Sequence, residues 1–484
     1  MNIVQISAEL APWSKTGGLG DVCGALPKAL AERGHRVITV SPRYKNYEGA
    51  WDTGVRVRIH LFGHAHEVSY HHLRNDGVDH LFVDHIAYKR PGIYGDNSGV
   101  YGDNLFRFAL LCRAALEAPL RVPLDGAPIG EEVLFHCNDW HTALLPVFLE
   151  SIYRPAGRFA KSPAVFAIHN AGHHGTFEAH DFPGLDISTR WWGACDMDGR
   201  LNCMKAAVVL AAKLVTVSPT YARQLCIDHA HGLEGLFAHR SRDLWGILNG
   251  ISPDWDPAAD KHLAAPFSAD DLSGKATCKA ALQAEFGLPV RPEVPLFGVV
   301  ARLDHQKGID LLMGIAPWLL RQDVQLIVLG SGGASYEDFV RRIAREYPGR
   351  ARGFVGFSEP LAHRIEAGAD MFLMPSRFEP CGLNQLYSMR YGTVPVVHAT
   401  GGLADTVETW EPASGRGTGW AFRDFSGDAF AQAIGWAQHT YTHHKDAWRT
   451  IQQNGMRRDF GWDRAAKLYE ALYASAFGPA VSEG

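Results

Sequence analysis

Along most of the chain, short apolar runs with the length of buried strands alternate with segments of helical length and periodicity. The predicted strands lie at residues 2–7, 36–42, 133–139, 164–170, 213–219, 296–302, 324–330, 352–357, 369–376 and 394–400. Continuous apolar strands separated by helices are typical of parallel sheets that are covered on both faces. We therefore predict an α/β fold with two doubly wound sheets.

Two further segments depart from this alternation. Residues 55–84 alternate polar and apolar side chains at period two, which predicts antiparallel strands at the edge of the first sheet. After residue 425 the pattern is helical throughout. Large aromatic residues recur there, and we expect them in the core rather than around a ligand. They are Trp436, Trp448, Trp462 and Tyr469.

The length of 484 residues exceeds what one hydrophobic core supports, because single cores rarely grow beyond about 250–300 residues. The polar stretch at 250–292 carries several Pro and Gly residues, as a domain boundary does. We predict a first domain over residues 1–250 and a second domain over 251–461.

Composition limits the partners that the chain can have. The formal net charge is −5 with both signs well mixed, so we expect neither nucleic acid nor an anionic membrane surface as a partner. No run of about 18 or more apolar residues occurs, and no signal-peptide pattern opens the chain. The eight cysteines form no CxxC pair. We expect a cytoplasmic chain without a disulfide framework.

Two basic, glycine-flanked segments each follow a predicted strand: KTGGLGD at 15–21 and RLDHQKG at 302–308. Glycine lets the backbone approach an anion, while Lys15, Arg302 and Lys307 supply positive charge where a strand ends and a helix begins. Neither segment is a Walker loop or a GxGxxG dinucleotide fingerprint. The pair of loops predicts a phosphate of a sugar nucleotide held between two halves.

Polar residues and glycines follow several other predicted strands. Because ligands of open parallel sheets bind beyond the carboxyl ends of the strands, these residues are candidates for a cleft between the two sheets. They are Asp139, His169, Asn170, Ser331, Gly332, Glu379, Thr400, Gly401 and Gly402. Taken alone, Asp139 is equally a helix cap, and His169 equally a satisfied histidine. Glu379 differs, since Pro380 and Gly382 shape a tight turn that aims its carboxylate.

A metal site is not expected. The triplets at 196–198 and 254–256 each hold two aspartates separated by one residue. Gly follows the first triplet and Pro follows the second, as in turns. The histidines show no zinc-like spacing. Arg302 and Lys307 can neutralise a diphosphate without a metal, so we predict neither a metal nor another cofactor.

Several motifs give the chain a likeness to a known family. With KTGGLGD, HCNDWH and RLDHQKG, they are VSPTYA (217–222), GILNGISPDW (246–255), PSRFEPCGLNQLYSMRYGTVPVV (375–397) and ATGGLADTV (399–407). Over nearly its whole length the chain resembles bacterial glycogen synthases and the related plant starch synthases. The resemblance implies the GT-B architecture: two Rossmann-like domains with a deep interdomain cleft, and a C-terminal segment at about 462–484 that packs back on the first domain.

The resemblance also implies an activity. A member transfers glucose from ADP-glucose to the non-reducing end of an α-1,4-glucan, glycogen or a maltooligosaccharide, with retention at the anomeric carbon. It implies attack on the face from which the phosphate departs, and the departing phosphate accepts the acceptor proton.

The family's roles fall on positions of this sequence. Arg302 and Lys307 would hold the diphosphate, and Glu379 would bind the donor glucose and stabilise positive charge at the reacting carbon. His169 would contact the donor glucose, and Asp139 would orient the sugar or the acceptor. With these, the residues that we predict to bind substrate are Lys15, Gly17, Gly18, Asn170, Asn249, Ser331, Gly332, Cys381, Gly382, Leu383, Thr400, Gly401 and Gly402. Asp21 would brace the Lys15 loop, and Tyr94 and Tyr101 would face the glucan acceptor.

One segment departs from the family. Where members usually have HNLAYQG, this chain has HNAGHHG at 169–175. A relative that uses UDP-glucose or another acceptor is therefore an alternative, as is a catalytically silent glucan-binding protein. An epimerase would not need KTGGLGD, and a phosphorylase would need a longer chain with a lysine-bound pyridoxal phosphate. The sequence does not specify the oligomeric state.

Overall fold

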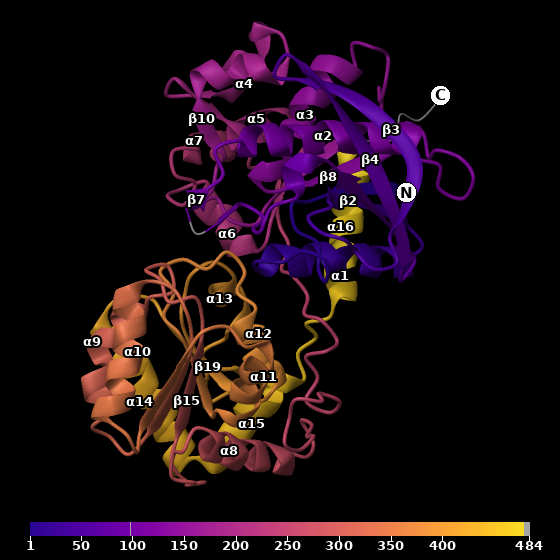
Figure 1. Cartoon of the computed structure of the whole chain (residues 1–484). Coiled ribbons are helices and arrows are strands. Elements are labelled where there is room, and N and C mark those ends of the chain that lie inside the picture. The colour runs from indigo at the N-terminus through magenta and orange to yellow at the C-terminus, as the bar shows by residue number, and fades with distance from the viewer. Residues whose placement is uncertain (97, 479–484) are drawn as a thin grey trace. The chain divides into compact units, whose positions relative to one another are not determined.

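The computed structural model describes residues 1–96 and 98–478. The chain folds into two compact units (Figure 1). Unit 1 consists of Met1–Gly250 and the C-terminal segment that begins at Trp462, and unit 2 is Ile251–Gly461. The end of the predicted segment 462–484, residues 479–484, lies outside the described residues.

The larger sheet of unit 1 has the strand order β14-β13-β9-β8-β1-β2-β5-β4-β3. Neighbours from β14 to β5 are parallel, whereas β4 pairs antiparallel with both β5 and β3. The strands are β1 (Asn2–Ile6), β2 (Arg36–Pro42), β3 (Trp51–Leu61), β4 (His64–Asn75), β5 (Val78–Asp84), β8 (Leu134–Asn138), β9 (Ala164–Ile168), β13 (Lys213–Thr216) and β14 (Leu244–Gly246). The predicted parallel core and antiparallel edge are confirmed.

Short strands complete unit 1. They are β6 (Gly95–Asp96), β7 (Gly99–Val100), β10 (Thr176–Glu178), β11 (Asp196–Met197) and β12 (Arg200–Asn202). The helices are α1 (Gly18–Glu32), α2 (Asn104–Arg121), α3 (Leu144–Phe148), α4 (Trp192–Cys195), α5 (Cys203–Leu210), α6 (Pro219–Leu225), α7 (Glu234–His239) and α16 (Trp462–Ala476). Around α3, Trp140–Thr142 forms a 3₁₀ turn and Leu149–Tyr153 forms a π turn.

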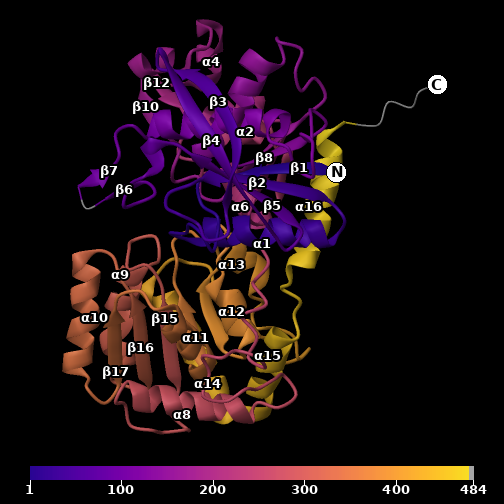
Figure 2. The ribbon, with the colours of Figure 1, turned by 45° about the vertical axis from the view of Figure 1, so that its right-hand side comes forward.

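The helices α1 and α16 lie side by side on one face of the unit 1 sheet (Figures 1 and 2). Apolar side chains of both helices pack on the inner strands of the sheet. Arg33, just after α1, donates from Nε and one terminal nitrogen to both carboxylate oxygens of Glu470, at 2.9 and 2.7 Å. The hydroxyl of Tyr473 lies 2.5 Å from Nδ1 of His136 on β8. The last helix is therefore an integral part of unit 1.

The sheet of unit 2 is parallel throughout its described strands, in the order β17-β16-β15-β18-β19-β20. The strands are β15 (Leu296–Val300), β16 (Gln325–Gly330), β17 (Ala351–Val355), β18 (Met371–Met374), β19 (Val394–His398) and β20 (Trp420–Phe422). All of these strands except β20 were predicted. Strand β20 has three residues, which are too few to show a periodicity.

Helices cover both faces of this sheet (Figure 1). One face carries α9 (Ile309–Leu319), α10 (Ala334–Glu346) and α14 (Gly427–His443), and α15 (Lys445–Met456) contacts α14 on this face and α12 on the other. The other carries α8 (Ser273–Glu285), α11 (Glu359–Gly368), α12 (Asn384–Arg390) and α13 (Gly401–Thr406). This is the doubly wound arrangement that the alternation of strands and helices predicts.

One aromatic residue was misplaced by the sequence analysis. Trp448, Trp462 and Tyr469 are buried as predicted, but the Trp436 side chain is 53% exposed. The inward face of α14 carries Phe430, Ala433, Ile434 and Ala437, at the i, i+3, i+4, i+7 spacing of a buried helical stripe. Residue 436 lies outside this stripe, so its indole faces solvent.

Among the helices of residues 1–96 and 98–478, none combines the length and the apolar composition that a membrane span requires.

Candidate active site residues

Three loops meet at the carboxyl ends of the unit 2 strands: 302–308 after β15, 375–383 after β18 and 400–402 after β19. Their backbones are in direct contact at glycines. Gly308 has φ +67°, and a Cβ there would lie 1.8 Å from the Pro375 carbonyl oxygen. Gly401 has φ +44°, and a Cβ there would lie 2.0 Å from the Glu379 carbonyl oxygen. Only glycine tolerates both the positive φ and the close approach of a carbonyl oxygen, so these two positions allow the three loops to pack against one another.

Glu379 and Lys307 form an ion pair at the meeting point of two of these loops. Lys307 Nζ donates to Glu379 Oε2 at 2.5 Å, and the hydroxyl of Ser376 donates to the same oxygen at 3.1 Å. The side chains are 8% exposed for Glu379 and 20% for Lys307. A carboxylate oxygen that accepts from two donors at low exposure has a fixed position. The site thus presents an oriented negative charge beside a cation.

The other basic residue of the 302–308 loop has a different environment. Arg302 is exposed, and its guanidinium contacts Asp304 and Gln306, each at 3.1 Å. Surface contacts of this kind are weak and exchange readily for a stronger anion. Arg302 can therefore turn toward a phosphate by giving up only weak contacts.

The remaining predicted residues of unit 2 also lie at strand ends. Gly332, after β16, donates its amide to Glu337 at 3.0 Å, while Ser331 beside it is exposed. Cys381 is buried, and its carbonyl accepts from Gln385 at 3.0 Å. The adjoining turn residues Gly382 and Leu383 lead into α12, and Thr400 and Gly402 are buried around the start of α13. The predicted set is thus brought to one edge of the sheet.

In unit 1, the KTGGLGD loop is organised by a residue that the sequence analysis missed. The carboxylate of Glu9 accepts from the amides of Thr16 and Gly17, at 2.6 and 3.2 Å, and from the Thr16 hydroxyl at 2.7 Å. Lys15, on the exposed side, pairs with Asp21 at 2.7 Å, as predicted. Glu9 is 3% exposed. The only sequence signal for it is an acidic residue just after a strand.

Tyr94 and Tyr101 lie beside this loop. The hydroxyl of Tyr94 donates to Glu9 Oε1 at 2.6 Å, and its ring stacks on His141 with centroids 4.6 Å apart. Tyr101 lies under two guanidinium groups, those of Arg90 at 4.8 Å and Arg107 at 5.1 Å. Both tyrosines therefore have structural partners, and their predicted role toward an acceptor stays a prediction.

Asp139 and His169 end adjacent strands of unit 1 and are in contact. Asp139 Oδ1 accepts from the backbone amides of His169 at 2.7 Å and Asn170 at 3.4 Å. Asp139 adopts φ +55°, a conformation that costs a non-glycine residue about 1–3 kcal/mol and that is often found at functional sites. Burial raises the pKa of Asp139 to about 7.

The ring of His169 has a defined tautomer. Asn138 donates its amide nitrogen to the Ile6 carbonyl at 2.9 Å, so Asn138 Oδ1 faces His169 Nε2 at 2.9 Å. Nε2 must then carry the proton, which leaves Nδ1 as an acceptor. Burial lowers the pKa of His169 to about 4 and keeps the ring neutral. Such a ring can accept a hydrogen bond from a sugar hydroxyl.

Asn249 and the HNAGHHG segment complete the predicted residues of unit 1. Asn249 is buried, and its Oδ1 has no hydrogen-bond partner among the described residues. An orphaned buried oxygen is costly unless a ligand or water satisfies it. In the unusual segment, His173 is exposed, whereas His174 lies 3.0 Å from Asn202. Of the two histidines that depart from the family pattern, His173 thus lies on the surface and His174 contacts a neighbouring side chain.

Within residues 1–96 and 98–478, no group of three or more His, Cys, Asp or Glu side chains is arranged to hold a metal ion. Both aspartate triplets form turns, as predicted: Asp196 accepts from the Gly199 amide at 2.9 Å, and Asp256 from the Ala258 amide at 3.1 Å.

Comparison with known proteins decides the family. Residues 2–239 match the starch synthase catalytic domain, and residues 283–453 match glycosyl transferases group 1. Starch synthase 1 of Arabidopsis thaliana is 47% identical over 98% of this chain and 77% of its own length. Starch synthase 1 of Triticum aestivum is 48% identical, with the same two shares of 98% and 77%. The chain belongs to the starch synthase family.

Solved structures agree with this assignment. The catalytic domain of starch synthase IV from Arabidopsis thaliana, bound to ADP and acarbose, has a TM-score of 0.88 and 30% identity, and the match covers 98% of this chain and 99% of that one. Sucrose-phosphate synthase from Thermosynechococcus elongatus shares the fold, with a TM-score of 0.62, 18% identity and coverage of 99% and 100%. The fold is GT-B, and the resemblance stated from the motifs is confirmed.

The position of Asp139 leads to a pH-dependent prediction for this family member. Its pKa is raised to about 7 in the folded protein, against about 3.9 in an unfolded chain. Between these values the folded state holds a proton that the unfolded state has released, so the free energy of unfolding falls as pH rises through this window. Asp139→Asn keeps an acceptor oxygen but removes the titration.

We therefore expect Asp139→Asn to gain stability relative to the wild type by roughly 1–3 kcal/mol between pH 5 and pH 8. Urea unfolding midpoints at both pH values measure this difference. The contributions of the nearby histidines to the pH dependence are the same in both proteins, so they cancel when the two are compared. An offset between variant and wild type that is the same at both pH values would contradict the raised pKa.

Proposed function

We propose that this protein is a glucosyltransferase that moves glucose from ADP-glucose to the non-reducing end of an α-1,4-glucan, with retention at the anomeric carbon. The observation that carries the proposal is identity of 46–48% to starch synthases over 98% of the chain. The related structure that holds ADP and acarbose supports the choice of ADP-glucose as the donor and a glucan as the acceptor.

In the proposed reaction, unit 2 binds the sugar nucleotide. Arg302 exchanges its surface contacts for the diphosphate, and Lys307 offsets charge on the departing ADP. Lys307 also holds Glu379, whose carboxylate faces the positive charge that develops at the anomeric carbon. The 2.5 Å contact between them supports a shared function, because each fixes the position of the other.

Unit 1 contributes neutral hydrogen-bonding groups in this proposal. His169 accepts a bond from a sugar hydroxyl through Nδ1, and Asn249 does so through its unsatisfied Oδ1. Asp139 holds the backbone of His169 and Asn170 in place. None of these groups needs to transfer a proton.

Bond formation and bond breaking occur on the same face of the sugar. The acceptor hydroxyl oxygen forms the new bond to the anomeric carbon, while the bond from that carbon to the phosphate oxygen breaks and its electron pair stays with ADP. The hydroxyl proton passes to the departing phosphate oxygen. This route requires no carboxylate nucleophile, which suits Glu379, since its Oε2 is already engaged by Lys307 and Ser376.

Incubation with maltotriose and ADP-glucose tests the proposal. The expected product is maltotetraose whose new linkage has the α configuration by proton NMR and is cut by β-amylase. A β-configured product, or a faster reaction with UDP-glucose, would contradict it.

A residue outside the predicted set gives a further prediction. Glu9→Ala leaves the Thr16 and Gly17 amides and the Tyr94 hydroxyl without their partner. The loop then has to be ordered when the donor binds, so we expect kcat/KM for ADP-glucose to fall about tenfold or more. Steady-state kinetics measure the change.

Glu9→Gln is the matched control, because its oxygen can still accept from both amides while its NH₂ group meets the two hydroxyls. We expect it to recover most of the activity. Equal kcat/KM in the wild type and Glu9→Ala would show that Glu9 does not position the loop.

A further inference from the structure

His398, the last residue of β19, contacts the segments that follow the neighbouring strands on both sides. Its Nδ1 lies 2.7 Å from the carbonyl oxygen of Ser376, at the start of the 375–383 loop. Its Nε2 lies 3.1 Å from the carbonyl oxygen of Arg423, just after β20. The His398 carbonyl accepts from the Thr400 amide at 2.8 Å. One residue thus joins two loops of the candidate active site to the end of β20.

Both oxygens that the His398 ring faces can only accept hydrogen bonds. A neutral imidazole has one N–H group, so it can donate to one carbonyl and must direct a lone pair at the other. An imidazolium has two N–H groups and can donate to both. His398 is 9% exposed and Ser376 is 2% exposed, so a carbonyl oxygen left without a donor here would be costly. The geometry therefore suits the protonated ring.

Aromatic rings limit how the His398 ring can turn. The centroid of Phe422 lies 5.4 Å from that of His398, and the centroid of Phe425 lies 5.2 Å away. Phe425 in turn carries the guanidinium carbon of Arg377 at 4.2 Å from its centroid. The imidazole is thus held between side chains that offer its nitrogens no hydrogen-bonding oxygen, and the two carbonyls are its polar contacts in this arrangement.

The charged side chains of the 375–383 loop are engaged with partners of opposite sign. Arg377 pairs with Asp310 of α9, and Glu379 pairs with Lys307. Glu379 is connected to His398 through Ser376, whose hydroxyl donates to Glu379 Oε2 at 3.1 Å while its carbonyl faces the ring. A change at the ring can therefore reach the carboxylate through one residue.

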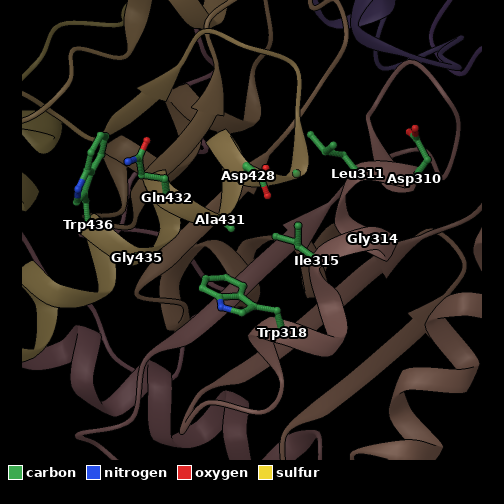
Figure 3. Close-up of a pocket in the computed structure, with 11 residues that line it drawn as sticks. Asp310, Leu311, Gly314, Ile315, Trp318, Asp428, Ala431, Gln432, Gly435 and Trp436 are labelled. Atoms are coloured by element: carbon green, nitrogen blue, oxygen red, sulfur yellow. The ribbon is translucent and has the colours of Figure 1, made fainter.

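The charged side chains on the other sides of His398 are at least partly exposed. Arg423, Asp424 and Asp428 follow β20 and are exposed, and Asp405 of α13 is partly exposed. Asp428, together with Asp310, lines a groove of about 840 Å³ between α9 and α14 (Figure 3). The ring nitrogens themselves face carbonyl oxygens, so these oxygens set how many N–H groups the ring needs.

We propose that His398 is a positioning residue for the transfer reaction, and that its doubly protonated ring ties the 375–383 loop to the end of β20. When the ring loses one proton, it can donate to only one of the two carbonyls. Whichever carbonyl is released, the tie is broken and Glu379 is held less firmly. Histidine changes charge between pH 5 and pH 8, so the tie is present at the lower pH and is lost as pH rises. This role rests on the proposed function.

The pH dependence of kcat in His398→Gln tests the role. Glutamine does not titrate and has a single NH₂ group in place of the two ring nitrogens. We expect the wild-type kcat to exceed that of the variant about tenfold at pH 5, and the ratio to approach one at pH 8. The matched control is His363→Gln, because His363 is also buried in unit 2 but its Nδ1 faces the Asp260 carboxylate at 2.7 Å. Its ratio should be the same at both pH values.

His398→Arg is the conservative variant, because a guanidinium keeps its proton and its donors at every pH in this range. We expect its kcat, divided by that of His398→Gln, to stay constant from pH 5 to pH 8. The wild type, divided by the same variant, should show the fall described above.

A double-mutant cycle separates positioning from a general loss of structure. In the Glu379→Gln background the charge that His398 helps to place is already absent. We expect His398→Gln to lower kcat at pH 5 less than about twofold further in that background. A merely structural role would lower kcat by the same factor in both backgrounds.

Nitrogen-15 NMR of the histidine rings tests the contact without any transfer reaction. The His398 signals are identified by their loss in His398→Gln. We expect both ring nitrogens to carry protons at pH 5 and only one at pH 8. A protein that showed this change but transferred no glucose would support the contact and refute the proposed transferase.

Three results would overturn the proposal. The first is a His398 ring with one unprotonated nitrogen at pH 5. The second is a ratio of wild-type to His398→Gln kcat that is the same at pH 5 and pH 8. The third is an equal loss of kcat from His398→Gln with and without the Glu379 carboxylate.

Discussion

Glu379→Gln is expected to lower kcat by about 10³-fold or more while changing the KM for ADP-glucose only about threefold. The substitution keeps the size of the side chain and an acceptor oxygen for Ser376, but it removes the negative charge. The backbone carbonyl of Glu379, which accepts from Gly402 at 3.0 Å, is unaffected, so the loop keeps its shape. Steady-state kinetics with maltotriose measure both parameters.

Ser376→Ala is the matched control for this prediction. It removes one hydrogen bond to the same carboxylate oxygen and leaves the charge and the contact with Lys307 in place. We expect kcat to fall less than about tenfold. If Glu379→Gln kept more than about a tenth of the wild-type kcat, the proposed charge stabilisation by Glu379 would be wrong.

A chain that ends at Gly461 is expected to lose the cooperative unfolding transition of unit 1. Without α16, the core loses Trp462, Tyr469 and Tyr473, which are all buried. Truncating one large buried aromatic costs about 3–5 kcal/mol, whereas a whole domain is stable by only about 5–15 kcal/mol. Scanning calorimetry should show the unit 2 transition alone.

The exposed face of α16 offers a control for that experiment. Leu468 is 43% exposed, so Leu468→Ala should change the free energy of unfolding by less than about 0.5 kcal/mol. Tyr469 is the next residue and is buried, so Tyr469→Ala should lower the temperature of the unit 1 transition. A truncated chain that kept a unit 1 transition at the wild-type temperature would show that α16 is dispensable.

Much of the fold could be predicted because its parallel strands are apolar and separated by helices. The strands β1, β2, β8 and β15 were all placed within two residues at each end. Elements whose burial depends on tertiary contacts were harder to predict. The strand β20 has three residues, and Trp436 is exposed only because α14 turns another face to the sheet.

The candidate site was predictable as a set of residues but not as a set of contacts. Lys307 and Glu379 were each selected from strand-end motifs, yet the ion pair between them spans 72 positions and has no signal in the sequence. Glu9 was missed for the same reason, since its importance lies in the loop amides that it binds. The orphaned oxygen of Asn249 likewise becomes visible only through burial.

Glucose transfer from ADP-glucose to a glucan is best tested by following nucleotide release and glucan growth together. The purified protein is incubated with maltotriose and either ADP-glucose or UDP-glucose, and the nucleoside diphosphate and the lengthened chains are quantified over time. We expect one glucose added per ADP released, with a higher kcat/KM for ADP-glucose than for UDP-glucose. Nucleotide release without chain growth, or no release from either donor, would contradict it.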